Sequence, residues 1–321
     1  MPKPSKIPEN QLARVYRLEK LFEEALNSGN LTKAKIALND LKEILERFHH
    51  NARILQAYLK LYETALEAWD IELAKRGFQF VREKANKRTR LYLEATTLLA
   101  ITHLRDQDIF SAEPLMAEVL KNDTIIKSEE QRRIFRKEII VRFDQEGALS
   151  SLAKSHPEVI REAQIHQDAI RLLRQGLSDE ELEENLGQKI PQEVKDFILK
   201  VDMLSKNVLP YTQRLMLPSP KDVIKNRQVA SLVFNAIKRR LFVYICDEDS
   251  ESYQAWINGG LDAIVSKSYV ASAVVAALAD LRIGVSAVAV GVTALLIKKG
   301  LENFCNNYKP KSLMILRKRG S

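Results

Sequence analysis

Cysteine is the most chemically versatile side chain in this 321-residue chain, and it occurs only as Cys246 and Cys305. The two cysteines are far apart in the sequence, with no CxxC pair and no Cys/His cluster beside them. This spacing argues against a disulfide framework and against a structural zinc site. We therefore expect two reduced thiols in a cytoplasmic protein. The polar N-terminus "MPKPSKIPEN", which lacks the apolar core of a secretory signal, agrees with that expectation.

The stretch "REAQIH" places Arg161 five residues before His166. This spacing resembles the Arg-x4-His element of the helical HEPN ribonucleases, and the resemblance implies RNA cleavage. Glu162 stands where that family usually has Asn, Asp or His, and so short a motif also arises by chance. A ribonuclease is therefore an alternative, and the main expectation is a protein without enzymatic activity.

No other stretch carries a catalytic or cofactor signature. The sequence has no P-loop, no GxGxxG after a strand, no HExxH and no GxSxG. The acidic run "CDEDSESY" at 246–253 suits a helix cap as well as a metal site, and "RRLFVYI" before it is the best strand candidate. We expect no cofactor and no metal.

The elements around these residues repeat themselves in the first half of the chain. "GNLTKAKIAL", "WDIELAKRGF" and "QDIFSAEPLM" begin at residues 29, 69 and 107 and align without gaps. The alignment superimposes three alanines and, four positions later, three large apolar residues: Ala34, Ala74 and Ala112, then Leu38, Phe78 and Met116. Alanine lets two antiparallel helices approach closely, and the larger residue lies one turn further on the same face. Each unit is therefore predicted to be a helix, a short turn and a second helix, and such pairs must stack to bury their cores.

This pattern resembles the tetratricopeptide (TPR) repeat, although its period is longer than the 34 residues of that family. The resemblance covers about residues 10–120, with a degenerate fourth unit after it. It implies that the first helices of the pairs line a surface that binds a protein or peptide segment. The groove candidates on these helices are Lys20, Gln56, Lys60, Glu63 and Arg105.

The region 158–217 is helical by its periodicity, and we expect it to connect the repeats at 10–157 to a C-terminal helical domain at 218–321. Residues 1–9 are expected to be a disordered tail. Within the connecting helices, Ser178 is interpreted as an N-cap and Glu181 as its capping-box partner.

The stretch 269–297 is almost wholly apolar, and Asp280 and Arg282 carry its only charges. As one membrane helix it would place both charges near the bilayer centre, at a cost of about 2.5 to 3.5 kcal/mol each. A break at "DLRIG" gives two shorter helices, and Ala273, Ala277, Ala287 and Gly291 favour close packing between helices. We predict an Ala/Val-rich hairpin in a soluble core, with peripheral membrane association and a constitutive span as alternatives.

Charge is unevenly distributed in a chain with a net charge of +8. The C-terminus is basic and suits an anionic surface, either lipid or nucleic acid. The candidates for this contact are Lys298, Lys299, Arg317, Lys318 and Arg319. Further basic clusters lie at 132–142 and 238–240, but no aromatic residues interleave them as single-strand binding would require.

The sequence therefore predicts an all-α protein, with a TPR-like array followed by a helical domain built around the hairpin. Its predicted function is a non-enzymatic interaction module, an adapter or sensor, that binds a protein or peptide. One alternative is a two-part effector of the toxin or defence type, whose repeats sense a partner and whose hairpin acts at a membrane. Another is a nucleic-acid-associated protein. The predicted location is the cytoplasm, with possible contact to a membrane surface through 269–299.

Overall fold

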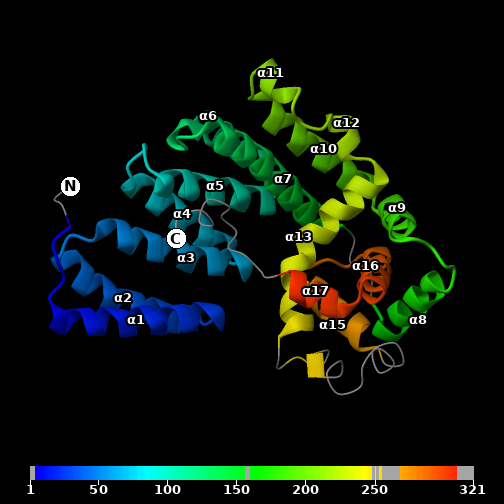
Figure 1. Cartoon of the computed structure of the whole chain (residues 1–321), viewed down its shortest axis with the longest axis horizontal. Helices are drawn as coiled ribbons and strands as arrows, with labels where there is room; N and C mark the ends of the chain where they lie inside the picture. The colour runs from blue at the N-terminus through cyan, green and yellow to red at the C-terminus, as the bar shows by residue number, and fades with distance from the viewer. Residues whose placement is uncertain (1–3, 156–159, 248–249, 251–252, 255–267, 309–321) are drawn as a thin grey trace. The chain divides into compact units, whose positions relative to one another are not determined.

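The structure is a computed structural model that describes residues 4–155, 160–247, 250, 253–254 and 268–308. Over these residues the chain is built of α-helices and contains no strand (Figure 1). The predicted all-α class is confirmed. Chain contacts divide the protein into two compact units: the first holds the described residues up to Arg136, and the second begins at Lys137. The division falls inside the long helix α7 (Glu129–Lys154) rather than near the predicted boundary at 157.

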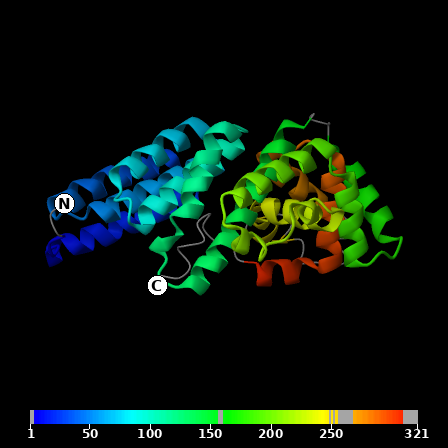
Figure 2. The same cartoon turned by 90° about the horizontal axis from the view of Figure 1, so that it is seen from above.

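Six helices in three pairs make up most of the first unit. They are α1 (Glu9–Asn27), α2 (Leu31–Arg47), α3 (Asn51–Glu67), α4 (Ile71–Lys84), α5 (Arg90–Arg105) and α6 (Ile109–Lys121), followed by a 3-10 turn at Asp123–Ile125. Each helix packs against the next one along the chain, and Figure 2 shows them lying side by side. The helical boundaries at 31, 71 and 109 are those that the internal alignment predicts.

The turn inside each pair has the same construction three times. The N-cap residues Asn30, Asp70 and Asp108 each accept a hydrogen bond from the backbone N–H three residues later. The residue before each cap is left-handed, with φ of 68° at Gly29 and 59° at Trp69 and Gln107. Only glycine adopts that conformation without a steric cost, so the last two turns hold it by their surrounding hydrogen bonds.

The repeated apolar positions form the interior of the first unit. Ala34, Ala74 and Ala112 are completely buried, and Leu38, Phe78 and Met116 are buried beside them. The predicted inward positions of the repeat are therefore confirmed. Between α3 and α4 the fit is tightest, because a Cβ on Gly77 would lie 2.1 Å from the Tyr62 ring.

The second unit contains the rest of α7 and nine further helices among its described residues. These are α8 (Glu162–Leu173), α9 (Asp179–Lys189), α10 (Gln192–Asn207), α11 (Tyr211–Arg214), α12 (Pro220–Val223), α13 (Asn226–Cys246), α15 (Tyr269–Asp280), α16 (Ser286–Lys299) and α17 (Leu301–Asn307). The predicted capping box is present at the start of α9, where Ser178 and Glu181 bond reciprocally.

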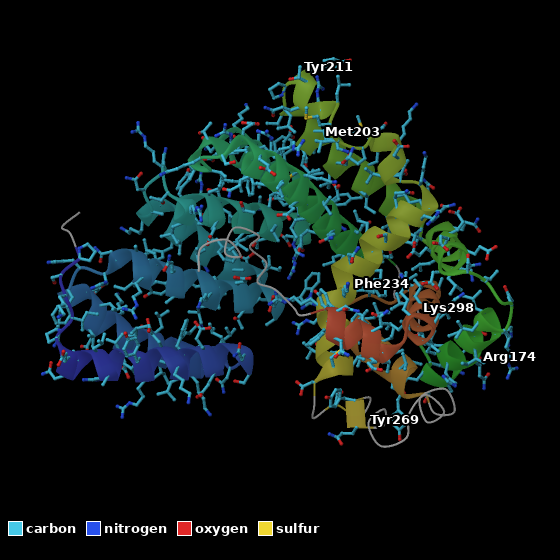
Figure 3. All side chains as sticks on the ribbon, in the orientation of Figure 1. Arg174, Met203, Tyr211, Phe234, Tyr269 and Lys298 are labelled. Carbon is cyan, nitrogen blue, oxygen red and sulfur yellow. A yellow bond between two sulfur atoms is a disulfide. The ribbon has the colours of Figure 1, made fainter. Side chains whose placement is uncertain are left out.

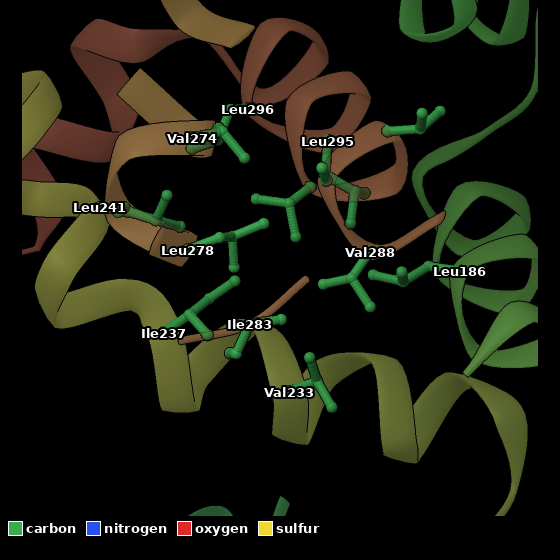
Figure 4. Packing of buried hydrophobic residues seen from close by; sticks show 14 of the residues in the cluster. Leu186, Val233, Ile237, Leu241, Val274, Leu278, Ile283, Val288, Leu295 and Leu296 are labelled. Carbon is green, nitrogen blue, oxygen red and sulfur yellow. The ribbon is translucent and has the colours of Figure 1, made fainter. Parts of the chain in front are cut away.

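The predicted hairpin is the pair α15 and α16, and it forms the centre of the second unit. The chain breaks between them at Leu281 to Val285, and Arg282 takes a left-handed φ of 59°. The two helices pack with α8, α9 and α13 around one apolar cluster, where Val274, Leu278 and Leu295 are at most 1% exposed (Figure 4). Within the described residues, no helix has both the length and the apolar character needed to cross a bilayer.

The small residues of the hairpin work partly as predicted. Ala273 and Ala277 are buried. Gly291, however, faces the neighbouring helix α9, since a Cβ there would lie 2.8 Å from a methyl group of Leu186. The close approach that glycine permits is therefore between the hairpin and α9.

The predicted strand "RRLFVYI" is wrong, because residues 239–245 continue α13. The buried residues Val233, Ile237, Leu241 and Ile245 recur every four positions, which is the period of a helix. The short apolar run that suggested a strand is overridden by this longer helical pattern and by the packing of α13 against α9 and α15.

The expectation of two reduced thiols is also wrong. Cys246 at the end of α13 and Cys305 in α17 form a disulfide, with Cα atoms 5.5 Å apart and a sequence separation of 59. Their helices meet through edge-to-face ring pairs, Phe234 with Phe304 and Phe242 with Tyr308. Distance along the sequence did not reveal this proximity, and the inference of a reducing compartment loses its basis.

Candidate functional site

The repeat places four polar or aromatic side chains at equivalent positions on the first helices of two neighbouring pairs. Tyr16 and Lys20 lie on α1, and Gln56 and Lys60 occupy the same register on α3. We call these four residues the first-helix face. Tyr16 is 58% exposed, and Lys20 and Gln56 are exposed as well. Equivalent positions on stacked pairs point to the same side, so these groups form one strip.

Ion pairs between α1 and α3 keep this strip in register. Arg53 donates two hydrogen bonds to Glu19, each 2.7 Å long, and Lys60 donates to Glu23. Lys20 forms only a loose pair with Glu24, with Nζ and Oε1 3.7 Å apart and both side chains more than half exposed. Lys60 is thus partly neutralised within the protein, whereas Lys20 is accessible to a ligand.

The other two groove candidates lie inside the unit. Glu63 is 5% exposed and Arg105 is 7% exposed. Arg105 donates to the carbonyl of Leu66 at 2.8 Å, and its guanidinium lies 5.7 Å from the centre of the Trp69 ring. Arg105 therefore joins α5 to the end of α3. The sequence register located both residues correctly along their helices but gave no sign that they are buried.

Tyr16 is the residue of this face that the sequence analysis did not identify. The sequence did contain a sign of its position, because the internal alignment matches Tyr16 with Gln56. An exposed aromatic side chain on the first-helix face is typical of a binding surface, where it supplies contact area with few rotatable bonds.

A different cluster of charges is buried in the second unit. Asp202 and Lys206 on α10 form an ion pair, with Oδ1 and Nζ 2.5 Å apart, and Lys206 also donates to the carbonyl of Pro218 at 2.8 Å. Burial, followed by the negative charge of Asp202, raises the pKa of Asp144 on α7 well above its usual value. Burial and the charge of Asp202 therefore favour the protonated form of Asp144 beside the Asp202–Lys206 pair. Lys206 anchors the chain around Pro218 to α10.

The basic groups at the end of the hairpin are engaged within the protein. Lys298 contacts the carbonyl of Leu177 and lies 3.8 Å from Asp179, and Lys299 donates to Glu183 at 3.0 Å. The acidic helix α9 thus neutralises them. The other three anionic-surface candidates, Arg317, Lys318 and Arg319, lie outside the described residues.

The basic cluster at 238–240 lies beside aromatic rings, which the sequence did not indicate. Lys238 lies with its Nζ 4.4 Å from the centre of the Tyr308 ring. Burial, and then the charge of Lys299, lowers the pKa of Lys238. The rings are buried or half-buried, however, and Arg240 lies 3.8 Å from Asp280. The cluster offers no exposed ring on which a base would stack.

Arg161 and His166 are carried by one helix. Arg161 is the exposed N-cap residue of α8, and His166 is half-buried one turn further on. Nδ1 of His166 is buried and has no hydrogen-bond partner among the described residues. No group of three or more His, Cys, Asp or Glu in the described part of the chain is placed to hold a metal ion.

Comparison with models of protein families, with curated proteins and with solved structures finds no match for this chain.

Proposed function

We propose that this protein is an interaction module whose first unit binds a protein or peptide segment along the first-helix face. The observation that carries the proposal is the exposure of Tyr16, Lys20 and Gln56 on helices that are otherwise packed and tied together by ion pairs. Repeats with short identical turns hold such a strip rigid before binding, which lowers the entropic cost of association.

The chemistry of the face defines the segment that fits it. Tyr16 offers an aromatic surface with a hydroxyl, Gln56 an amide, and Lys20 a cation that pairs loosely with Glu24 at 3.7 Å. A segment with an apolar side chain and a carboxylate one or two residues from it would match these groups. The TPR-like alignment supports the same mode, since the first helices of that family's pairs face the ligand.

A peptide selection tests this function. The full chain is immobilised and a random twelve-residue peptide display library is selected on it. Enriched peptides are synthesised and their dissociation constants are measured by fluorescence anisotropy. We expect Tyr16→Ala with Lys20→Glu to weaken binding at least tenfold. Ile36→Ala, which removes an exposed side chain from α2, is the matched control and should change binding less than twofold.

Two results would contradict the proposal. One is the absence of any enriched sequence after repeated rounds. The other is a set of peptides that bind the Tyr16→Ala, Lys20→Glu variant as tightly as the unaltered chain while circular dichroism shows that both are folded.

The other candidate functions lack a specific observation in their favour. Action of the hairpin at a membrane would require the core of the second unit to open, since α15 and α16 lie at its centre. In the basic cluster at 132–142, three arginines are already paired with acids of the chain. Arg132 and Arg136 bond Glu129, and Arg142 bonds Glu146. For a ribonuclease, Arg161 is an exposed N-cap residue and His166 is half-buried on the same helix, and no hydrogen bond joins them among the described residues.

A further inference from the structure

A group of exposed apolar side chains lies near the end of α10, at the start of α11 and in the turn directly after α11, in the second unit. Met203 is 45% exposed, Tyr211 67%, Leu215 66% and Met216 69%. The other exposed large apolar residues of the described chain are spread over α1, which carries two of them, and over several further helices that carry one each. Figure 3 shows Met203 and Tyr211 at the same end of the second unit, away from Tyr269. A concentration of this kind marks an interaction surface.

Three exposed cations accompany these side chains. Lys200 lies one turn before Met203 on α10, Arg214 ends α11, and Lys221 follows on α12. Between Met203 and Lys221 the sequence contains no acidic residue. The nearest acids are already paired, Asp202 with the buried Lys206 and Asp222 with Lys225 at 2.6 Å. We call this surface the α10–α11 tip: Lys200, Met203, Tyr211, Arg214, Leu215, Met216 and Lys221.

Hydrogen bonds within the second unit hold the backbone around the tip in place. Lys206 ties Pro218 to α10 from within, and Arg214 reaches back toward Asn207 on α10, with Nη1 and Oδ1 3.5 Å apart. The backbone N–H groups of Leu215, Met216 and Leu217 donate to carbonyls of Tyr211, Gln213 and Arg214. These three N–H groups are therefore already bonded within the chain, which lowers the cost of bringing the segment towards an apolar medium.

We propose that the α10–α11 tip docks onto an anionic lipid surface. Tyr211, Leu215 and Met216 would enter the boundary between headgroups and acyl chains, where the tyrosine hydroxyl meets the headgroups. Arg214 and Lys221 would contact the phosphates. The Arg214 guanidinium lies 6.0 Å from the centre of the Tyr211 ring, so its positive charge lies beside the aromatic side chain that would enter the lipid boundary. Exposed apolar side chains accompanied by cations are the pattern of an interfacial contact.

The charge pattern favours lipid over a second protein surface. A protein partner would have to present a matching acidic patch around an apolar contact, whereas an anionic bilayer offers phosphates beside an apolar interior over its whole surface. The tip itself carries cations only, and Asp202 next to Met203 is paired with the buried Lys206. Asp222 next to Lys221 is paired with Lys225 on the surface, and Asp196, one turn before Lys200, is exposed. This contact is independent of the first-helix face, which belongs to the other unit.

Flotation with vesicles of phosphatidylcholine containing a quarter phosphatidylserine tests the proposal, with pure phosphatidylcholine as the neutral reference. The full chain should float with the anionic vesicles and at least tenfold less with the neutral ones. Leu215→Ser with Met216→Ser, and separately Arg214→Glu with Lys221→Glu, should each reduce the bound fraction at least tenfold. The first pair tests insertion and the second tests charge.

Matched controls separate the tip from general effects of apolar or basic residues. Val243→Ser removes an exposed apolar side chain of α13, and Lys33→Glu with Lys35→Glu reverses two exposed charges of α2. Both should float as the unaltered chain does, and circular dichroism should show that all variants are folded. These controls matter because the net charge of +8 attracts any anionic surface.

Three results would overturn the proposal. The first is failure of the unaltered chain to float with anionic vesicles. The second is flotation that the Lys33→Glu, Lys35→Glu control loses as much as the tip variants do. The third is a dimer in sedimentation velocity that Leu215→Ser with Met216→Ser dissociates, because the tip would then be a contact between two copies of this chain.

Discussion

The hairpin α15–α16 and the α10–α11 tip differ in how far neighbouring helices cover their apolar side chains. The hairpin is the most apolar stretch of the chain, yet Val274 and Leu278 in it are completely buried. The tip has a mixed sequence with three prolines nearby, yet Tyr211, Leu215 and Met216 are each about two-thirds exposed. Apolar composition therefore does not identify the surface that meets a lipid or a partner. Burial by neighbouring helices decides it.

The largest expected effect comes from placing a charge in each region. Val274→Asp buries a carboxylate in a fully apolar cluster, and we expect it to lower the free energy of unfolding by more than about 4 kcal/mol, enough to unfold the second unit. Leu215→Asp at the tip should change stability by less than about 0.5 kcal/mol. Urea unfolding followed by circular dichroism measures both. Equal midpoints for the two variants would show that the hairpin is not a core.

Loss of the disulfide should have the next largest effect. Cys246→Ser with Cys305→Ser releases a loop defined by a sequence separation of 59, and the unfolded chain then gains entropy equivalent to about 4 kcal/mol. The unfolding midpoint should fall to the value that the unaltered chain shows in dithiothreitol. In this variant, hydrogen exchange should rise in α17 and at the end of α13 but stay unchanged at the tip. An unchanged midpoint would contradict the cross-link.

The buried carboxyl pair below the tip predicts a pH dependence. Because the pKa of Asp144 is raised in the folded protein above the unfolded value of 3.8, its contribution to stability is fully present below that value. It is lost as the pH rises through the folded pKa, at about 1.4 kcal/mol per pH unit between the two pKa values. Asp144→Asn keeps a donor for Asp202 and removes this titration.

The measurement is a series of urea unfolding curves from pH 4 to pH 8. The stability of Asp144→Asn relative to the unaltered chain should rise with pH across the part of this range that lies below the folded pKa, and then level off. Asp196→Asn, on an exposed carboxylate of the same helix as Asp202, is the control and should show no such trend. A constant difference between Asp144→Asn and the unaltered chain would mean that Asp144 is ionised when folded.

The smallest effect is expected at the basic end of the hairpin. Lys299 pairs with Glu183 on a partly exposed surface, so Lys298→Ala with Lys299→Ala should cost less than about 1 kcal/mol of stability. Binding to anionic vesicles should change less than threefold, since the tip carries that contact. A tenfold loss of vesicle binding would move the lipid contact from the tip to the hairpin.

The sequence predicts the first unit better than the second for a physical reason. Helices joined by short turns interact mainly with their neighbours along the chain, so the spacing of Ala34, Ala74 and Ala112 was enough to place the turns and the inward faces. The side-chain cap at Asp70 and the break near Arg282 are local features of the same kind. All depend on residues within a few positions of one another.

What the sequence did not reveal depends on contacts between distant residues. Cys246 and Cys305 meet only because α13 and α17 pack together, and Arg105 is buried because the carbonyl of Leu66 accepts its hydrogen bond. The tip is visible only when one knows which apolar residues the neighbouring helices leave uncovered. No property of residues 203–216 alone distinguishes them from a connecting segment that packs inward.

Hydrogen–deuterium exchange of the full chain with and without anionic vesicles tests the central claim most directly. We expect slow exchange throughout α15 and α16 in both conditions, and slower exchange at residues 208–217 only when vesicles are present. Fast exchange in the hairpin, or a change there with none at the tip, would contradict it.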